Sequence, residues 1–341
     1  MTDRDAAARS FIAQTDWADA RIAPLAGDAS NRRYLRLTHA ATGDTAVLMD
    51  APPERGEDTG PFVAIARYLT DLGLSAPRIL NIDSDTGFLL IEDLGDALFA
   101  RIVRTEPTLE PTLYAAATDV LIALHQHPPP MTLATYDARL MADMAALAYD
   151  WYLGHAGNAD AAARAAFHDA IMRTLRTEVG ETNVLIQRDY HAENLLWLPE
   201  RTGLARVGLL DFQDAMCGHP AYDLVSLLQD ARRDVPRRIA AQMIRRYIDY
   251  AEADPTAFDR AYHVLGAQRN LRILGVFARL CLRDGKPHYL DLMPRVWDHL
   301  MHDLEHPALT EIAPLVRAAL PALTPEILSL LREKCASVPT L

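Results

Sequence analysis

Lysine is almost absent from this sequence of 341 residues: Lys286 and Lys334 are the only two, so arginine carries nearly all of the positive charge. The formal net charge is -12, which argues against a nucleic-acid partner. Three scattered cysteines offer neither a disulfide framework nor a zinc spacing, and they suit a reducing cytoplasm. Apolar runs stay below the ~18 residues that a membrane helix needs. The acidic start at residues 1–5 does not resemble a secretory signal.

Two regions of different composition divide the chain. Residues 1–94 are predicted to form a small sheet with one helix, and residues 95–341 have mainly helical periodicity. The strand-like segments of the first region are 21–25, 34–38, 45–49, 79–82 and 87–91, and its helix spans 61–72. In the second region only 184–186, 195–198 and 206–210 are strand-like. We predict an α+β fold with a β-rich N-terminal lobe and a large helical C-terminal lobe, divided at residues 94 and 95.

The most informative segments are Gln187 to Asn194 and Leu210 to Asp214. Asp189 lies five residues before Asn194, a short apolar hairpin follows, and Asp211 then opens a new loop. Phosphoryl transfer from ATP needs a carboxylate that takes the acceptor hydroxyl proton, and oxygen ligands for Mg²⁺. We therefore predict Asp189 as the general base and Asn194 with Asp211 as the metal ligands. The alternative for each residue alone is a polar residue in a turn.

These segments resemble the protein-kinase-like superfamily, in the branch of aminoglycoside phosphotransferases and choline kinases. The pattern His-x-Asp-x-His-x-x-Asn is met by Asp189, His191 and Asn194, whereas Gln187 replaces its first histidine. The resemblance implies a two-lobed kinase that uses ATP and Mg²⁺. It also implies that Asp223, in the segment 218–224, starts a buried helix and braces the catalytic loop; the alternative is a surface helix residue.

The same resemblance assigns the nucleotide contacts. The turn that contains Gly27, Ser30 and Asn31 would cover the ATP phosphates with backbone N–H groups. The segment 88–95 resembles the hinge strand between the two lobes, and it would bind adenine through the Glu92 carbonyl and the Leu94 amide. These assignments rest on the resemblance, because an ordinary turn and an ordinary buried strand have the same patterns.

The sequence departs from the kinase pattern at the third strand, where a lysine normally contacts the phosphates. Residues 45–50 contain no lysine, and the helix that follows contains no glutamate to pair with it. Arg32, Arg33 and Arg36 are the nearest cations, and we predict Arg33 as the phosphate contact. A solvent-facing hairpin charge is the equal alternative.

Five segments narrow the resemblance to the bacterial anomeric kinases of N-acetylmuramate and N-acetylglucosamine, over about residues 10–330. They are 27–34, 49–54, 90–95, 187–195 and 210–215. The resemblance implies phosphorylation of the anomeric C1 hydroxyl in peptidoglycan recycling, in the cytoplasm and without an obligate protein partner. It also implies that the missing lysine is compatible with activity.

Five side chains are candidates for contact with the acceptor. Trp151 could stack on a sugar ring or lie in the core, and Arg188 could meet a carboxylate or hold the catalytic loop. His191, Gln213 and Asp214 could each bind a hydroxyl or order a loop. The rival hypotheses are a kinase of another small alcohol, of the aminoglycoside, choline or homoserine type, and a nucleotide-binding pseudokinase.

Overall fold

The computed structural model describes residues 3–25 and 31–339. The chain divides into two compact units, one of Met1–Val120 with Ala192–Ala215 and the other of Leu121–His191 with Met216–Leu341. This division differs from the predicted lobe boundary at residues 94 and 95, which stays a prediction. Within the described residues no helix combines the length and apolar character needed to cross a membrane.

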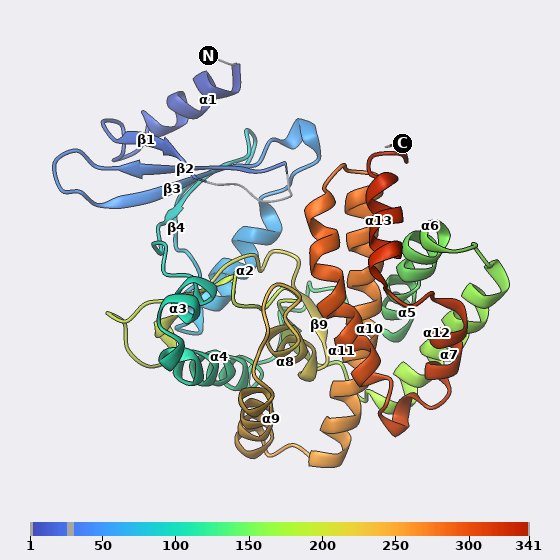
Figure 1. The fold of residues 1–341 in the computed structure, drawn as a ribbon. Helices are drawn as coiled ribbons and strands as arrows, with labels where there is room; N and C mark the ends of the chain where they lie inside the picture. Colours follow the sequence, from blue (N-terminus) through green and yellow to red (C-terminus); the bar gives the residue numbers. More distant parts are fainter. Residues whose placement is uncertain (1–2, 26–30, 340–341) are drawn as a thin grey trace. The chain divides into compact units, whose positions relative to one another are not determined.

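The first unit is built on a five-stranded antiparallel sheet in the order β1-β2-β3-β5-β4 (Figure 1). Its strands are β1 (Arg21–Pro24), β2 (Arg33–Thr38), β3 (Thr45–Asp50), β4 (Ile79–Asp83) and β5 (Phe88–Glu92). Helix α2 (Gly60–Asp71) follows β3 and ends before Gly73, whose φ of 77° is readily adopted only by glycine. The predicted strands and this helix are confirmed within one or two residues at each end.

Helix α1 (Asp3–Ile12) contradicts the prediction of one helix in this region. Ala8, Phe11 and Ile12 form its buried stripe and pack in one core cluster with Leu48 and Phe88 of the sheet. The sequence signal was weak because a helix of 10 residues offers only three such positions.

The first unit also contains two helices and a hairpin that come later in the chain. The helices are α3 (Phe99–Thr105) and most of α4 (Glu110–Leu124), and the hairpin pairs β7 (Leu195–Trp197) with β8 (Val207–Leu209). Leu94, Leu196 and Leu198 pack in one apolar cluster, which joins the end of the hinge strand to this hairpin.

The second unit is helical around α10 (Pro255–Leu282), which contacts most of its neighbours (Figure 1). The other helices are α5 (Ala138–Ala145), the π-helix η3 (Ala148–Leu153), α6 (Gly154–Ala156), α7 (Ala161–Glu178), α8 (Ala221–Leu228), α9 (Arg237–Ala251), α11 (Met293–Asp303), α12 (Ile312–Ala319) and α13 (Pro325–Glu333). Gly275 lets η3 approach α10 closely, because a Cβ there would lie 2.3 Å from the backbone of Leu147.

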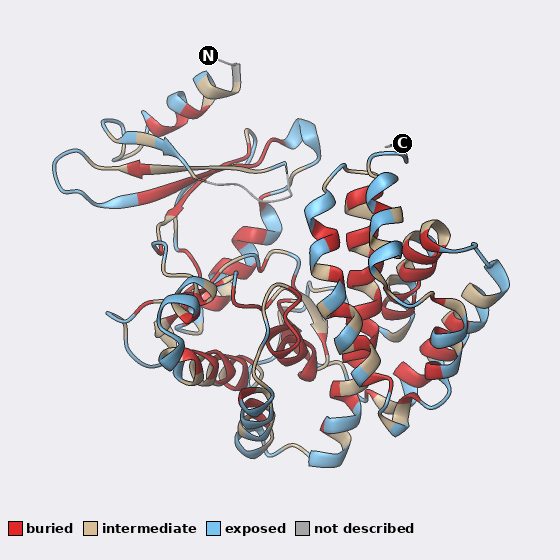
Figure 2. Cartoon of the chain, in the orientation of Figure 1, coloured by how far each residue is buried: buried red, intermediate tan, exposed pale blue. Residues whose placement is uncertain are grey.

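A two-stranded sheet of β6 (Val184–Ile186) and β9 (Met216–Gly218) leads into the catalytic segment. Strand β9 was not predicted, because its three residues show neither alternation nor β-branched side chains. Helix α8 follows it, and all eight of its residues are buried (Figure 2).

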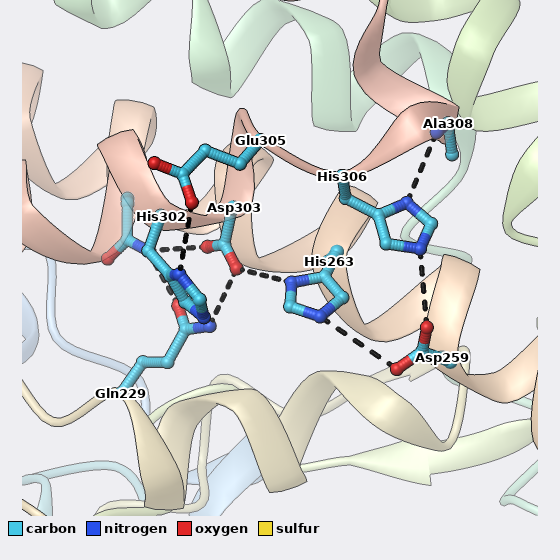
Figure 3. A network of polar contacts seen from close by, with 9 residues as sticks. Gln229, Asp259, His263, His302, Asp303, Glu305, His306 and Ala308 are labelled. Carbon is cyan, nitrogen blue, oxygen red and sulfur yellow. Dashed lines mark hydrogen bonds and ion pairs between the residues drawn. The ribbon is translucent and has the colours of Figure 1, made fainter. Parts of the chain in front are cut away.

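Asp303 on α11 is the centre of a polar network inside the second unit (Figure 3). Its fully buried carboxylate accepts hydrogen bonds from Gln229 Nε2 at 3.0 Å, His263 Nδ1 at 2.9 Å and Asn270 Nδ2 at 3.3 Å. Gly266 leaves room for it, since a Cβ at that position would lie 2.3 Å from Asp303 Oδ2. The network therefore joins the C-terminal end of α8 to α10 and α11.

Candidate active site

The backbone that precedes Asp189 is held by α8. Asp223 accepts hydrogen bonds from the amides of Gln187 at 2.6 Å and Arg188 at 2.8 Å. The Ser226 hydroxyl donates to the Arg188 carbonyl at 3.2 Å. Arg188 has a φ of 72°, a left-handed conformation that a non-glycine residue keeps only when its surroundings enforce it. These three hydrogen bonds supply that constraint and fix the direction in which the chain enters Asp189.

Asp223 is fully buried in the first turn of α8, which begins directly after Pro220. Burial raises the pKa of Asp223 to about 7, while the hydrogen bonds from the two amides lower it. A buried carboxylate is tolerated here because each of its oxygens receives a backbone N–H.

Asp189 is half-buried, and the charges around it favour its ionised form. Burial alone would raise its pKa, but the positive charge of Arg272, with smaller contributions from Arg269 and Arg188, lowers the pKa below its ordinary value. The carboxylate is therefore ionised at neutral pH and can accept a hydrogen bond from a hydroxyl group.

Helix α10 supports the catalytic loop from the other side through residues that the sequence analysis missed. Arg269, which is 3% exposed, donates from Nη2 to Ser226 Oγ at 2.8 Å. Gln268 donates to the Tyr136 hydroxyl at 3.2 Å, and the Arg188 guanidinium lies 5.3 Å from the Tyr136 ring centroid. The available signal was the run of polar residues 268–270 inside an apolar helix, since buried polar groups of this kind need partners.

His191 is buried and contacts another residue missed from sequence, Arg232. The Arg232 Nη1 atom donates to His191 Nε2 at 3.1 Å. Burial, together with the charge of Arg232, lowers the pKa of His191 to about 4, so the ring is neutral and carries its proton on Nδ1. This contact orders the catalytic loop; substrate contact by His191 stays a prediction.

The two predicted metal ligands meet at the ends of the β7–β8 hairpin. Asn194 precedes β7 and Asp211 follows β8, and Asn194 Nδ2 lies 3.3 Å from Asp211 Oδ2. The hydrogen bond from the Leu210 amide to the Asn194 carbonyl, at 3.0 Å, closes the hairpin at this point. Gln213 donates to Asp211 Oδ1 at 2.7 Å. Asp211 is exposed and has a φ of 57°, while the next residue, Phe212, is fully buried and anchors the loop.

This donor set fits Mg²⁺. One carboxylate and one amide side chain supply hard oxygen ligands, because the amide of Asn194 can present its oxygen after a flip. Magnesium usually takes only one or two protein carboxylates and completes its shell with phosphate and water. In residues 3–25 and 31–339 no cluster of three or more His, Cys, Asp or Glu residues could hold a metal by itself.

The predicted nucleotide contacts are only partly described. Gly27 and Ser30 lie outside the described residues. The Asn31 amide donates to Glu57 Oε1 at 3.2 Å. Glu92 ends β5 with its carboxylate bound by arginines, and Leu94 is buried. Their contacts with ATP stay predictions.

Arg33 is held by carboxylates in the structure. Its Nη1 atom lies 2.5 Å from Asp5 Oδ1, and its Nη2 atom lies 2.9 Å from Asp50 Oδ2. A phosphate would have to replace these partners, so the predicted role of Arg33 requires the ion pairs to open.

The predicted acceptor contacts lie on different segments. Arg188 and His191 flank the predicted base Asp189, whereas Gln213 and Asp214 follow the predicted metal ligand Asp211. Trp151 lies on η3, where its half-buried ring stacks on His155 with centroids 5.9 Å apart.

Comparison with known proteins shows the family and the fold class of this chain. The family model described as "Phosphotransferase enzyme family" matches residues 21–256, and the chain belongs to this family. Among solved structures, ADP-bound aminoglycoside phosphotransferase APH(2'')-Ib aligns at a TM-score of 0.59 and 13% identity, covering 92% of this chain and 99% of that one. Choline kinase LicA from Streptococcus pneumoniae aligns at a TM-score of 0.56 and 13% identity, and the alignment covers 84% of this chain and 93% of that one. The predicted protein-kinase-like α+β class is confirmed.

Curated relatives are more similar in sequence. A protein of Caulobacter vibrioides is 40% identical, covering 91% of this chain and 95% of its own length. A protein of Pseudomonas aeruginosa is 35% identical over 91% of this chain and 92% of its own length. A protein of Neisseria meningitidis is 32% identical over 85% of this chain and 87% of its own length. All three are named N-acetylmuramate/N-acetylglucosamine kinase.

Proposed function

We propose that this chain is an ATP-dependent kinase that phosphorylates the anomeric C1 hydroxyl of N-acetylmuramate and N-acetylglucosamine. The observation that carries the proposal is the identity of 32–40% to four curated kinases with this name, over 85–91% of the chain. The candidate base and the candidate metal ligands fall inside the segment matched by the family model.

In the proposed reaction Asp189 orients the C1 hydroxyl and takes its proton. The sugar oxygen bonds to the γ-phosphorus while the bond to the ADP oxygen breaks, so the products are the sugar 1-phosphate and ADP. A magnesium ion held at the candidate metal site would supply positive charge against the phosphates of ATP. Asn194 and Asp211 would hold it, and Asp223 keeps the base in place through the loop backbone.

The charges near the base favour a neutral or anionic acceptor over a cationic one. The groups that act on Asp189 include three arginines, Arg188, Arg269 and Arg272. A cationic aminoglycoside or choline would need acidic partners instead. Asp150, a candidate for that role, is bound by Arg164 through two hydrogen bonds of 2.6 and 3.0 Å.

The proposal includes a cellular role. Free amino sugars released from peptidoglycan need activation at C1 before they can enter a UDP-sugar, and this kinase would provide it in the cytoplasm. Its partners would be ATP, Mg²⁺ and the amino sugar.

The test is an assay with Mg-ATP and a panel of N-acetylmuramate, N-acetylglucosamine, choline and kanamycin, with product identified by mass. We expect phosphorylated amino sugar only. The Asp189→Ala variant should lose turnover while it keeps nucleotide binding, because the base does not bind ATP.

Two results would reject the proposal. Product from choline or kanamycin alone would indicate another acceptor class. Nucleotide binding without turnover on any acceptor would indicate a pseudokinase.

A further inference from the structure

The first unit contains a candidate for the cation that replaces the missing kinase lysine. Strand β3 contains no lysine. Arg32 lies directly before the neighbouring strand β2, and its Nε atom is 2.8 Å from Glu57 Oε2. The two side chains are only 10% and 14% exposed, so this is a largely buried ion pair. Kinases use the same combination, in which a carboxylate positions the cation that contacts the phosphates.

Glu57 connects this pair to the predicted phosphate turn. Its Oε1 atom accepts a hydrogen bond from the Asn31 amide at 3.2 Å, while Oε2 binds Arg32. Glu57 lies between η1 (Pro53–Arg55) and α2, so the segment before α2 supplies the carboxylate that α2 itself lacks.

Tyr34 on β2 is a further neighbour of the pair. Burial raises the pKa of Tyr34, and the charge of Arg32 with a hydrogen bond between the two side chains lowers it.

The other two candidate arginines have different surroundings. Arg33 is 41% exposed and is bound by Asp5 and Asp50. Arg36 binds Asp93 at 2.6 Å and Asp96 at 2.7 Å, at the hinge. Neither of these arginines binds Glu57 in these contacts.

We propose that Arg32 is the cation that contacts the phosphates of ATP in this chain, and that Glu57 orients its guanidinium. The inference rests on the proposed use of ATP and deepens it. It departs from the prediction that Arg33 has this role.

The test is the dissociation constant of wild type and Arg32→Gln for Mg-ATP and for adenosine, measured by calorimetry. Loss of a charge-assisted phosphate contact should raise the dissociation constant for Mg-ATP about 10- to 100-fold. Because adenosine has no phosphate, its dissociation constant should change less than about twofold. Arg32→Lys should lie between wild type and Arg32→Gln, because lysine keeps the charge but not the planar fork.

Arg4→Gln is the matched control. Arg4 is also a half-buried arginine of this unit in an ion pair, with Asp50 at 2.7 Å. We expect its ATP affinity to stay within about twofold of wild type. If Arg32→Gln does not fold, Glu57→Gln provides the second measurement. This variant should have a lower affinity for Mg-ATP but an unchanged affinity for adenosine.

The outcomes separate the two proposals. Equal loss of ATP and adenosine affinity, or no loss of either, would overturn the role of Arg32. A loss of ATP affinity in Arg33→Gln with none in Arg32→Gln would return the role to Arg33. A wild-type chain that binds no ATP would instead reject the proposed function.

Discussion

Asp223 and Asp303 are both fully buried carboxylates of the helical unit, and they differ in what they bind. Asp223 accepts only backbone amides among its recorded hydrogen bonds, and these amides belong to the catalytic loop. Asp303 accepts from the side chains of Gln229 and His263 (Figure 3), and from that of Asn270. Burial raises the pKa of each.

The comparison predicts that the same buried group serves function in one place and stability in another. A backbone amide cannot move without moving the chain, so Asp223 controls the direction of the loop that carries Asp189. Asp303 holds side chains of α8 and α10, and its loss would leave buried polar groups without an acceptor. Substitutions at the two sites should therefore affect different measurements.

The largest expected effect is on stability at Asp303. Asp303→Ala removes the shared acceptor of two buried amides, Gln229 and Asn270, and of the half-buried His263, so the free energy of unfolding should fall by about 3–5 kcal/mol. Urea unfolding measures this loss. The folded fraction should keep a kcat within about twofold of wild type, and a large fall in kcat would contradict the separation of roles.

The reverse result is expected at Asp223. Asp223→Asn keeps the size of the side chain, but its NH₂ group faces an amide donor, so one of the two loop contacts is lost. Misplacement of the base should lower kcat about 100-fold, with little change in the KM for ATP. Steady-state kinetics on folded protein checks this, and an unchanged kcat would show that Asp223 does not position the loop.

A smaller effect is expected at Ser226, which holds the Arg188 carbonyl. Ser226→Ala removes this hydrogen bond and the one from Arg269 Nη2. Loss of the contact with the loop, worth about 1 kcal/mol, should lower kcat about fivefold. Thr118→Val is the matched control, because it also removes a buried hydroxyl, one that bonds only within α4, to the Tyr114 carbonyl at 2.8 Å. Equal kcat losses in both variants would indicate a general packing effect.

The smallest effect concerns pH. Burial lowers the pKa of His263, but the hydrogen bond to Asp303 and the charges of Asp303 and Asp259 together outweigh it, so the pKa is raised above 6.5. The charged pair is present below pH 6.5 and is lost as pH rises through the raised pKa. Asp259 and His306 face the same ring. The stability advantage of wild type over His263→Gln, roughly 1 kcal/mol, should shrink between pH 6 and 9. A growing advantage would contradict this sign.

Sequence predicted the elements with strong patterns. The strand at 184–186 matches β6, and the helix predicted at 61–72 matches α2 within one residue at each end. The spacing of Asn194 and Asp211 around a hairpin predicted a pair that the structure brings together.

The remaining features depend on contacts between distant residues. Arg32 and Glu57 are separated by 25 residues, and no local pattern indicates that they pair. Ser226 and Arg269 support the catalytic loop only because α8 and α10 pack together. Such contacts come from tertiary packing, which one sequence does not reveal.

The most direct test of the account is the position of the new phosphate in the product of wild type with Mg-ATP and N-acetylglucosamine. Phosphorus–proton NMR should show coupling to the anomeric proton, and the methyl glycoside, whose C1 oxygen is blocked, should give no product. A phosphate on another carbon, or turnover of the methyl glycoside, would contradict the account.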